Sequence, residues 1–251
     1  MNKYLAGCCL FALLAASCAS KGNQQEKENA SSQQTITVDS KVQITPEYAE
    51  GFQLTYADGY ILMDIHDPQN EESTHFLVPR GTKPEGIPAD YMVIETPVRS
   101  AICMTSLQLS NFIKLGAEDK VVGITSTRHL FNRTINDQLK EGKTAKIGIE
   151  GNFDNEGIMS INPDLILISP FKRGGYETMK DIGIPLIPHL GYKEMTPLGQ
   201  AEWIKFVGLL LGMEQEANDK FSAIEHRYNE LKELTAEGKG TRRPIVFSGE
   251  I

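Results

Sequence analysis

Short apolar runs alternate with segments of helical spacing between residues 98 and 187. The continuous runs VVGIT at 121–125 and LILIS at 165–169 indicate strands covered on both faces, because a strand with one wet face alternates apolar and polar residues. Between such runs, apolar residues recur three or four positions apart, as at Leu109 and Phe112, which is typical of a helix that buries one face. The alternation predicts an α/β fold in which an N-terminal lobe is a parallel sheet with flanking helices.

A small β-rich region is predicted before this lobe. Residues 35–95 hold several short runs of β-favouring residues separated by turn signals. The stretch FQLTYADGYILMDI at 52–65 predicts a hairpin, because apolar and aromatic residues flank a three-residue turn that contains Gly59. We therefore expect a small antiparallel sheet in this region.

Two helices are predicted after the lobe. Thr196 is suited to cap a helix that has Pro197 at its first position, and apolar positions three and four apart continue from there to Gly212. A second helix is predicted from about residue 214 to residue 236, with a narrow apolar stripe. At 1.5 Å per residue it is about 34 Å long, a length that suits a helix linking two lobes.

The first eighteen residues predict an export signal. Lys3 supplies the positive start, and the apolar stretch at 4–16 is too short to span a bilayer. The small residues before Cys18 resemble a bacterial lipobox, in which Cys18 becomes the lipidated first residue of the mature protein, although Ala15 stands where that pattern prefers Leu. The alternative is an ordinary secretory signal cleaved nearby.

Composition adds three constraints. The 251 residues, of which 40% are hydrophobic, suffice for a buried core. A formal net charge of -8 with scattered Lys and Arg disfavours nucleic acid as a partner. Cys103 lies inside an apolar run, where a small core residue is expected rather than a nucleophile.

The predicted organisation follows from these patterns. Residues 19–34 are polar and are expected to form a flexible tether. The predicted segments are a lipoprotein signal peptide at 1–18, the tether at 19–34, the β-rich region at 35–95, the N-terminal α/β lobe at 96–195, helices including a lobe-linking helix at 196–238, and the start of a C-terminal lobe at 239–251.

Three segments carry a family resemblance. They are the stretch at 99–125, the stretch at 150–169 and the helical LGQAEWIKFVGLLLG at 198–212. Within them, Asn162-Pro163-Asp164-Leu165-Ile166 matches a recurring x-P-D-L-I, and Leu115-Gly116 followed by Val122-Gly123-Ile124 matches an L-G, V-G-V step. In order and spacing, residues 97–251 resemble the substrate-binding proteins of iron-siderophore, haem and vitamin B12 ABC importers.

The resemblance implies a function and a location. It implies a protein that captures an iron complex, either a ferric siderophore or haem, and delivers it to an inner-membrane permease, with cobalamin as the alternative ligand. It also implies a periplasmic position at the cell envelope with a lipid anchor in the membrane, and neither catalysis nor a cofactor. In the family two α/β lobes are joined by one rigid helix, so residues 239–251 are expected to begin the second lobe of a fragment or of a truncated gene product.

Candidate ligand residues follow the predicted strands, because open α/β sheets bind ligands beyond the carboxyl ends of their strands. By position they are Thr105, Ser106, Thr127, Arg128, His129, Phe131, Phe171, Lys172 and Arg173. Three cations beside an aromatic residue favour an anionic iron complex, whereas cobalamin carries little net charge. The alternatives are solvated loop charges for the cations and capping of a helix for Thr105 and Ser106.

Glu177 has two interpretations. In the family an exposed Glu near this position binds an Arg of the permease, which makes Glu177 a candidate docking residue. The alternative is an acidic residue that stabilises the first turn of a helix.

The sequence favours neither metal binding nor catalysis. The five His residues form no close-spaced cluster with Cys or Asp, so no metal ligands are expected. An enzyme on an α/β fold is the alternative from another class, but G-x-G-x-x-G, P-loop and G-x-S-x-G motifs are absent from the sequence. A surface domain that binds another protein without transport is the remaining alternative.

Overall fold

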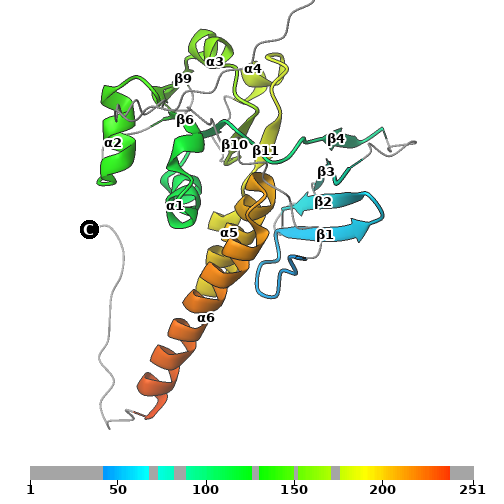
Figure 1. The fold of residues 1–251 in the computed structure, drawn as a ribbon, viewed down its shortest axis with the longest axis vertical. Helices are drawn as coiled ribbons and strands as arrows, with labels where there is room; N and C mark the ends of the chain where they lie inside the picture. Colours follow the sequence, from blue (N-terminus) through cyan, green and yellow to red (C-terminus); the bar gives the residue numbers. More distant parts are fainter. Residues whose placement is uncertain are drawn as a thin grey trace, which may run out of the picture. The chain divides into compact units, whose positions relative to one another are not determined.

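The computed structural model describes residues 42–67, 73–81, 89–125, 130–149, 152–170 and 176–237 (Figure 1). All of these residues belong to one compact unit, Val38–Ile251. The predicted signal peptide, tether and start of a C-terminal lobe lie outside the described residues. The domain boundaries given above therefore stay predictions.

Five parallel strands form the central sheet. They are β5 (Ala101–Cys103), β6 (Val121–Ile124), β7 (Ala145–Lys146), β10 (Leu165–Ile168) and β11 (Leu186–Pro188). Their spatial order is β11-β10-β5-β6-β7, and every neighbouring pair is parallel. The chain runs outward from β5 through β6 to β7 and then returns to the other side of β5, so the strand order reverses between β5 and β10. The predicted α/β fold with a parallel sheet is confirmed.

Short helices connect the strands. They are α1 (Ser106–Leu115), α2 (Arg133–Lys140), α3 (Asn155–Ile161) and α4 (Glu177–Lys180), with the 3-10 turns η1 (Glu118–Lys120) and η2 (Gly191–Lys193) and a small hairpin of β8 (Gly148–Ile149) and β9 (Asn152–Phe153). Helix α1 ends at Gly116 with φ of 70°. Helix α3 ends at Asn162 with φ of 48°, so a left-handed residue stops each helix shortly before the next strand.

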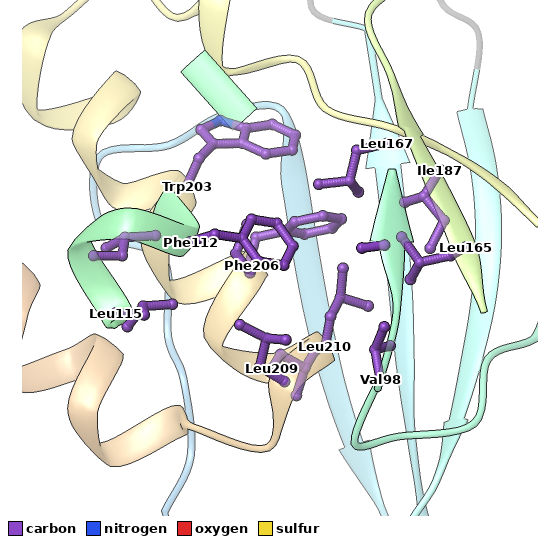
Figure 2. Packing of buried hydrophobic residues seen from close by; sticks show 14 of the residues in the cluster. Val98, Phe112, Leu115, Leu165, Leu167, Ile187, Trp203, Phe206, Leu209 and Leu210 are labelled. Atoms are coloured by element: carbon purple, nitrogen blue, oxygen red, sulfur yellow. The ribbon is translucent and has the colours of Figure 1, made fainter. Parts of the chain in front are cut away.

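Helices cover both faces of the sheet. Figure 2 shows Phe112 and Leu115 of α1, and Trp203 and Phe206 of the later helix α5 (Pro197–Leu211), packed with residues of β10 and β11. The opposite face packs against Ile158 of α3 and Met179 of α4. Burial on both faces explains why the strands are apolar throughout rather than alternating.

Two longer helices follow the sheet, as predicted. Helix α5 (Pro197–Leu211) is capped by Thr196, whose Oγ1 accepts a hydrogen bond from the Gly199 N–H at 3.0 Å. Helix α6 (Glu214–Glu237) has 24 residues and is about 36 Å long. The two helices pack against each other (Figure 1). Within the described ranges no helix combines the length and apolarity needed to span a bilayer.

The β-rich region forms a four-stranded sheet. Its strands are β1 (Phe52–Ala57), β2 (Tyr60–His66), β3 (Ser73–Pro79) and β4 (Tyr91–Val93), in that spatial order. The predicted hairpin is present as β1 and β2. The expectation of a purely antiparallel sheet is wrong, because β4 pairs parallel to β3. Eleven residues, 80–90, join these two strands, which is longer than the two-residue turn of a tight antiparallel hairpin.

A segment before β1, residues 42–51, binds to helix α5, and we call it the strap. The Glu202 carboxylate of α5 is fully buried and accepts the backbone N–H groups of Glu47, Tyr48 and Ala49 at 3.0, 2.7 and 2.8 Å. Lys205 Nζ lies 2.7 Å from the same carboxylate. Three backbone N–H groups of the strap therefore donate to a charged acceptor. Hydrogen bonds to a charged group are among the stronger ones in proteins.

A second buried carboxylate continues this attachment. Glu194 accepts the N–H groups of Glu50 and Gly51 at 3.1 and 3.0 Å and the indole Nε1–H of Trp203 at 2.9 Å. Gly51 is required here, because a Cβ would lie 2.9 Å from the Trp203 ring. The two carboxylates thus join the β-rich region to the helices that cover the parallel sheet.

Candidate functional site

The candidate site lies where the strand order of the parallel sheet reverses. Strands β5 and β10 lie side by side and end at Cys103 and Ile168. The chain continues into α1 after β5 and into residues 169–170 after β10. In doubly wound sheets the crevice for a ligand opens at this point, beyond the carboxyl ends of the strands. The topology therefore places Thr105, Ser106 and Ser169 at the edge where a ligand is expected.

Thr105 caps helix α1. Its Oγ1 accepts the Gln108 N–H at 3.4 Å, while Gln108 Oε1 accepts the Thr105 N–H at 3.0 Å, so the two residues form a reciprocal capping box. Capping was one of the two interpretations of Thr105. It does not exclude ligand contact, because Thr105 also lines a pocket described below.

Gln108 is a site residue that the sequence analysis missed. Its side chain is fully buried, and Oε1 also accepts the Met104 N–H at 2.7 Å. Its Nε2 donates to Ser169 Oγ at 3.0 Å, which joins the end of β5 to the end of β10. The pattern Thr-x-x-Gln after a strand signals a capping box, and could have identified Gln108 as a structural residue of this turn.

The segment after β10 is held by further hydrogen bonds. Tyr176 OH donates to the Ser169 carbonyl at 2.8 Å, and Tyr192 OH donates to the Pro170 carbonyl at 3.1 Å. Burial of Tyr192 is the largest cause of the rise of its pKa to about 12, so its phenol stays protonated at neutral pH. The strand end at residues 169–170 is therefore fixed by uncharged donors.

A pocket of about 180 Å³ opens beyond the ends of β5 and β6. The described residues that line it are Cys103, Met104, Thr105, Ser106, Leu109, Ile124, Thr125 and Leu130. The lining includes no Asp, Glu, His, Lys or Arg, and burial raises the pKa of the Cys103 thiol well above its ordinary value. These residues are therefore uncharged at neutral pH. A thiol that stays protonated behaves as a small apolar group, as predicted for Cys103.

Most of the predicted ligand residues lie outside the described residues. This applies to Thr127, Arg128, His129, Phe171, Lys172 and Arg173, to the side chain of Glu177 and to Cys18. Phe131 is described, and its side chain is 87% exposed. The assignment of these residues to ligand, permease or lipid stays a prediction.

His189 is a second residue that the sequence analysis did not place in the site. It follows β11 and is fully buried, with Nε2 3.0 Å from Asn111 Nδ2 and its ring 4.5 Å from that of Trp203. Desolvation lowers the pKa of His189 to about 3. Because His189 is neutral and shielded from solvent, it packs as a core residue against Asn111 of α1 and Trp203 of α5 and does not supply charge to a ligand.

Across the ranges given above, no group of three His, Cys, Asp or Glu side chains is arranged to hold a metal ion. Among the described residues, the His–carboxylate pair with the shortest separation is His75 and Asp64 on the four-stranded sheet, whose Nδ1 and Oδ1 atoms are 2.7 Å apart.

Comparisons with known proteins agree with this geometry. A family model described as periplasmic binding protein matches residues 102–250. An uncharacterized lipoprotein of Methanocaldococcus jannaschii is 27% identical over 148 residues, covering 54% of this chain and 35% of the relative. Another uncharacterized lipoprotein of that organism is 23% identical over 221 residues, covering 84% of this chain and 54% of the relative.

A solved structure shares the fold. The petrobactin-binding protein YclQ from Bacillus subtilis aligns with a TM-score of 0.50 and 17% identity, over 71% of this chain and 55% of that chain. The chain thus spans between about a third and about half of the length of the relatives described here.

Proposed function

Because the chain belongs to the periplasmic binding protein family, we propose that it captures an anionic iron complex outside the cytoplasm and delivers it to the permease of an ABC importer. The observation that carries this proposal is the reversal of strand order between β5 and β10, which sets a ligand crevice at one edge of the sheet in a family of binding proteins. The proposed role is binding and release, without catalysis.

Two further observations support the details. Two of the matched relatives are named lipoproteins, which supports the proposal that Cys18 carries a lipid and holds the protein at the membrane. The solved structure with this fold binds petrobactin, which supports a metal-chelating ligand over a sugar or an amino acid. For the permease, the proposed contact is Glu177, at the first position of α4.

The proposed ligand class rests on the cations predicted beside the crevice. Arg128 follows β6, and Lys172 and Arg173 follow β10, so both groups belong to segments that leave the same edge of the sheet. Guanidinium groups pair well with carboxylate and catecholate oxygens. Cobalamin remains the second candidate, because an uncharged ligand would use apolar walls instead.

The test is a calorimetric titration of the 251-residue chain with a ferric catecholate siderophore, haem and cobalamin. The described residues supply one lobe and so one wall of a cleft, and we expect the 251-residue chain to bind its ligand weakly or not at all, with no dissociation constant tighter than the high-micromolar range. In a chain to which a second lobe has been joined, we expect Arg128→Ala and Arg173→Ala each to weaken binding of the anionic iron complex about tenfold, the size of one charge-assisted contact.

Arg227→Ala on the exposed surface of α6 is the matched control and should leave the affinity unchanged. Binding of cobalamin alone would overturn the assignment of the ligand class. Equal affinities for the unaltered chain and the two crevice variants would show that the cations do not face the ligand.

A further inference from the structure

We propose that the pocket beyond β5 and β6 is a subsite for one uncharged, hydroxyl-bearing aromatic ring of the ligand. This inference rests on the function proposed above and extends it, because it assigns a separate chemistry to one part of the crevice. The cations would receive the charged centre of the complex, and the pocket would receive a peripheral arm.

The size of the pocket fits one ring. Its volume is about 180 Å³, and an apolar cavity of about 150 Å³ in another protein is sufficient to bind benzene. A larger planar group such as a whole porphyrin does not fit into such a space. The pocket therefore selects for a ligand with a small arm that can enter it.

The chemistry of the floor fits an apolar face. Cys103, Leu109 and Ile124 line the pocket and are each at most 5% exposed. They come from β5, α1 and β6, which are held together by the core beneath the sheet. A floor built from regular elements is preformed, so a ring that enters gains apolar contact without a large cost for ordering the site.

The rim offers both hydrogen-bonding roles. Thr125 Oγ1 donates its proton to the Met104 carbonyl at 2.7 Å, so the lone pairs of the Thr125 hydroxyl oxygen can accept a hydrogen bond. Thr105 Oγ1 accepts the Gln108 N–H, which leaves its own proton for donation. A phenolic hydroxyl both donates and accepts, and so matches this pair, whereas a carboxylate only accepts.

The experiment uses the full chain and phenol as the probe, with acetate as the charged, ringless comparison. Methyl resonances of Leu109, Ile124 and Leu130 are followed by NMR during each titration. We expect phenol to shift all three with a dissociation constant of about 1 mM, and to give intermolecular contacts to the Ile124 methyl groups. Acetate at the same concentrations should shift none of them.

Two variants separate the pocket from the general surface. Leu130→Trp fills the pocket from its partly exposed rim and should weaken phenol binding at least tenfold. Leu234→Trp makes the same change at a position of α6 that is 62% exposed, and should leave phenol binding unchanged. Absence of phenol contacts to Ile124 in the unaltered chain overturns the proposal without recourse to either variant.

Failure of the ring subsite can be told apart from failure of the proposed function. Binding of a ferric catecholate complex by the chain, together with no phenol contact to the Ile124 methyl groups, overturns the ring subsite and leaves the transport proposal standing. Phenol binding in the pocket, together with binding of cobalamin alone, supports the subsite as a ring site and overturns the anionic iron complex as the proposed ligand.

Discussion

At the scale of single residues, the site depends on uncharged groups held in fixed states. His189 is the clearest case, because a fully buried imidazole beside Trp203 is kept neutral by desolvation. Its role could not be predicted from sequence, since a His after a strand is equally consistent with a metal ligand or an exposed loop. The cap at Thr105 was predictable, because capping depends on residues only three apart.

The low pKa of His189 predicts a loss of stability in acid. Its folded-state pKa of about 3 lies below the unfolded value of about 6.5, so the unfolded chain binds the extra proton between these values. As the pH falls below 6.5, the free energy of unfolding should decrease by about 1.4 kcal/mol per unit from this residue, which gives about 2 kcal/mol between pH 6.5 and pH 5.

Denaturant unfolding of the unaltered chain and of His189→Gln at both pH values measures this term. The variant should lack the extra decrease, and His226→Gln, whose side chain is 78% exposed on α6, should keep it. Parallel stability curves for the unaltered chain and His189→Gln would show that His189 does not titrate as stated.

At the scale of elements, regular periodicity predicted the helices and the parallel strands. Apolar runs identified β6 and β10, and caps identified the start and end of α5. The strand order was not predictable, because no local pattern states which strand lies beside β5. The attachment of the strap was also hidden, because Glu202 contacts residues more than 150 positions earlier in the chain.

Removal of the Glu202 charge should loosen this attachment. Glu202→Gln replaces a carboxylate that accepts three backbone N–H groups and pairs with Lys205, and it leaves the buried ammonium without its counter-charge. We expect the free energy of unfolding to fall by about 2 to 4 kcal/mol. Glu233→Gln on the exposed surface of α6 is the matched control. A difference of less than about 0.5 kcal/mol between the two variants would show that the attachment of the strap to Glu202 contributes little to stability.

At the scale of the whole molecule, the proposed function requires a membrane anchor and a cleft. The parallel lobe and the long helix α6 were predictable from sequence, since both depend on patterns within about a hundred residues. The assignment of Arg128, Lys172 and Arg173 to the ligand stays a prediction, because these residues lie outside the described part of the chain.

The anchor is tested by fractionation of cells that produce the chain. Lipid on Cys18 should carry the unaltered protein into the membrane fraction, and Cys18→Ala should move it to the soluble fraction or leave it unprocessed at higher mass. Cys9→Ala, inside the predicted signal, should fractionate as the unaltered protein does. Recovery of processed Cys18→Ala protein entirely with membranes would contradict the assignment of the anchor.

The strap also decides where a mechanical load enters the protein. A pull on the chain ahead of residue 42 first loads the hydrogen bond from the Ile44 N–H to Tyr56 OH of β1 and that from Lys205 Nζ to the Thr45 carbonyl. It then reaches the three backbone bonds between residues 47–49 and Glu202, before any strand of the parallel sheet. Because three bonds converge on one carboxylate, they share the force and would break together rather than one after another. Tension applied upstream is thus carried by β1 and α5, and the ends of β5 and β10 are shielded from it.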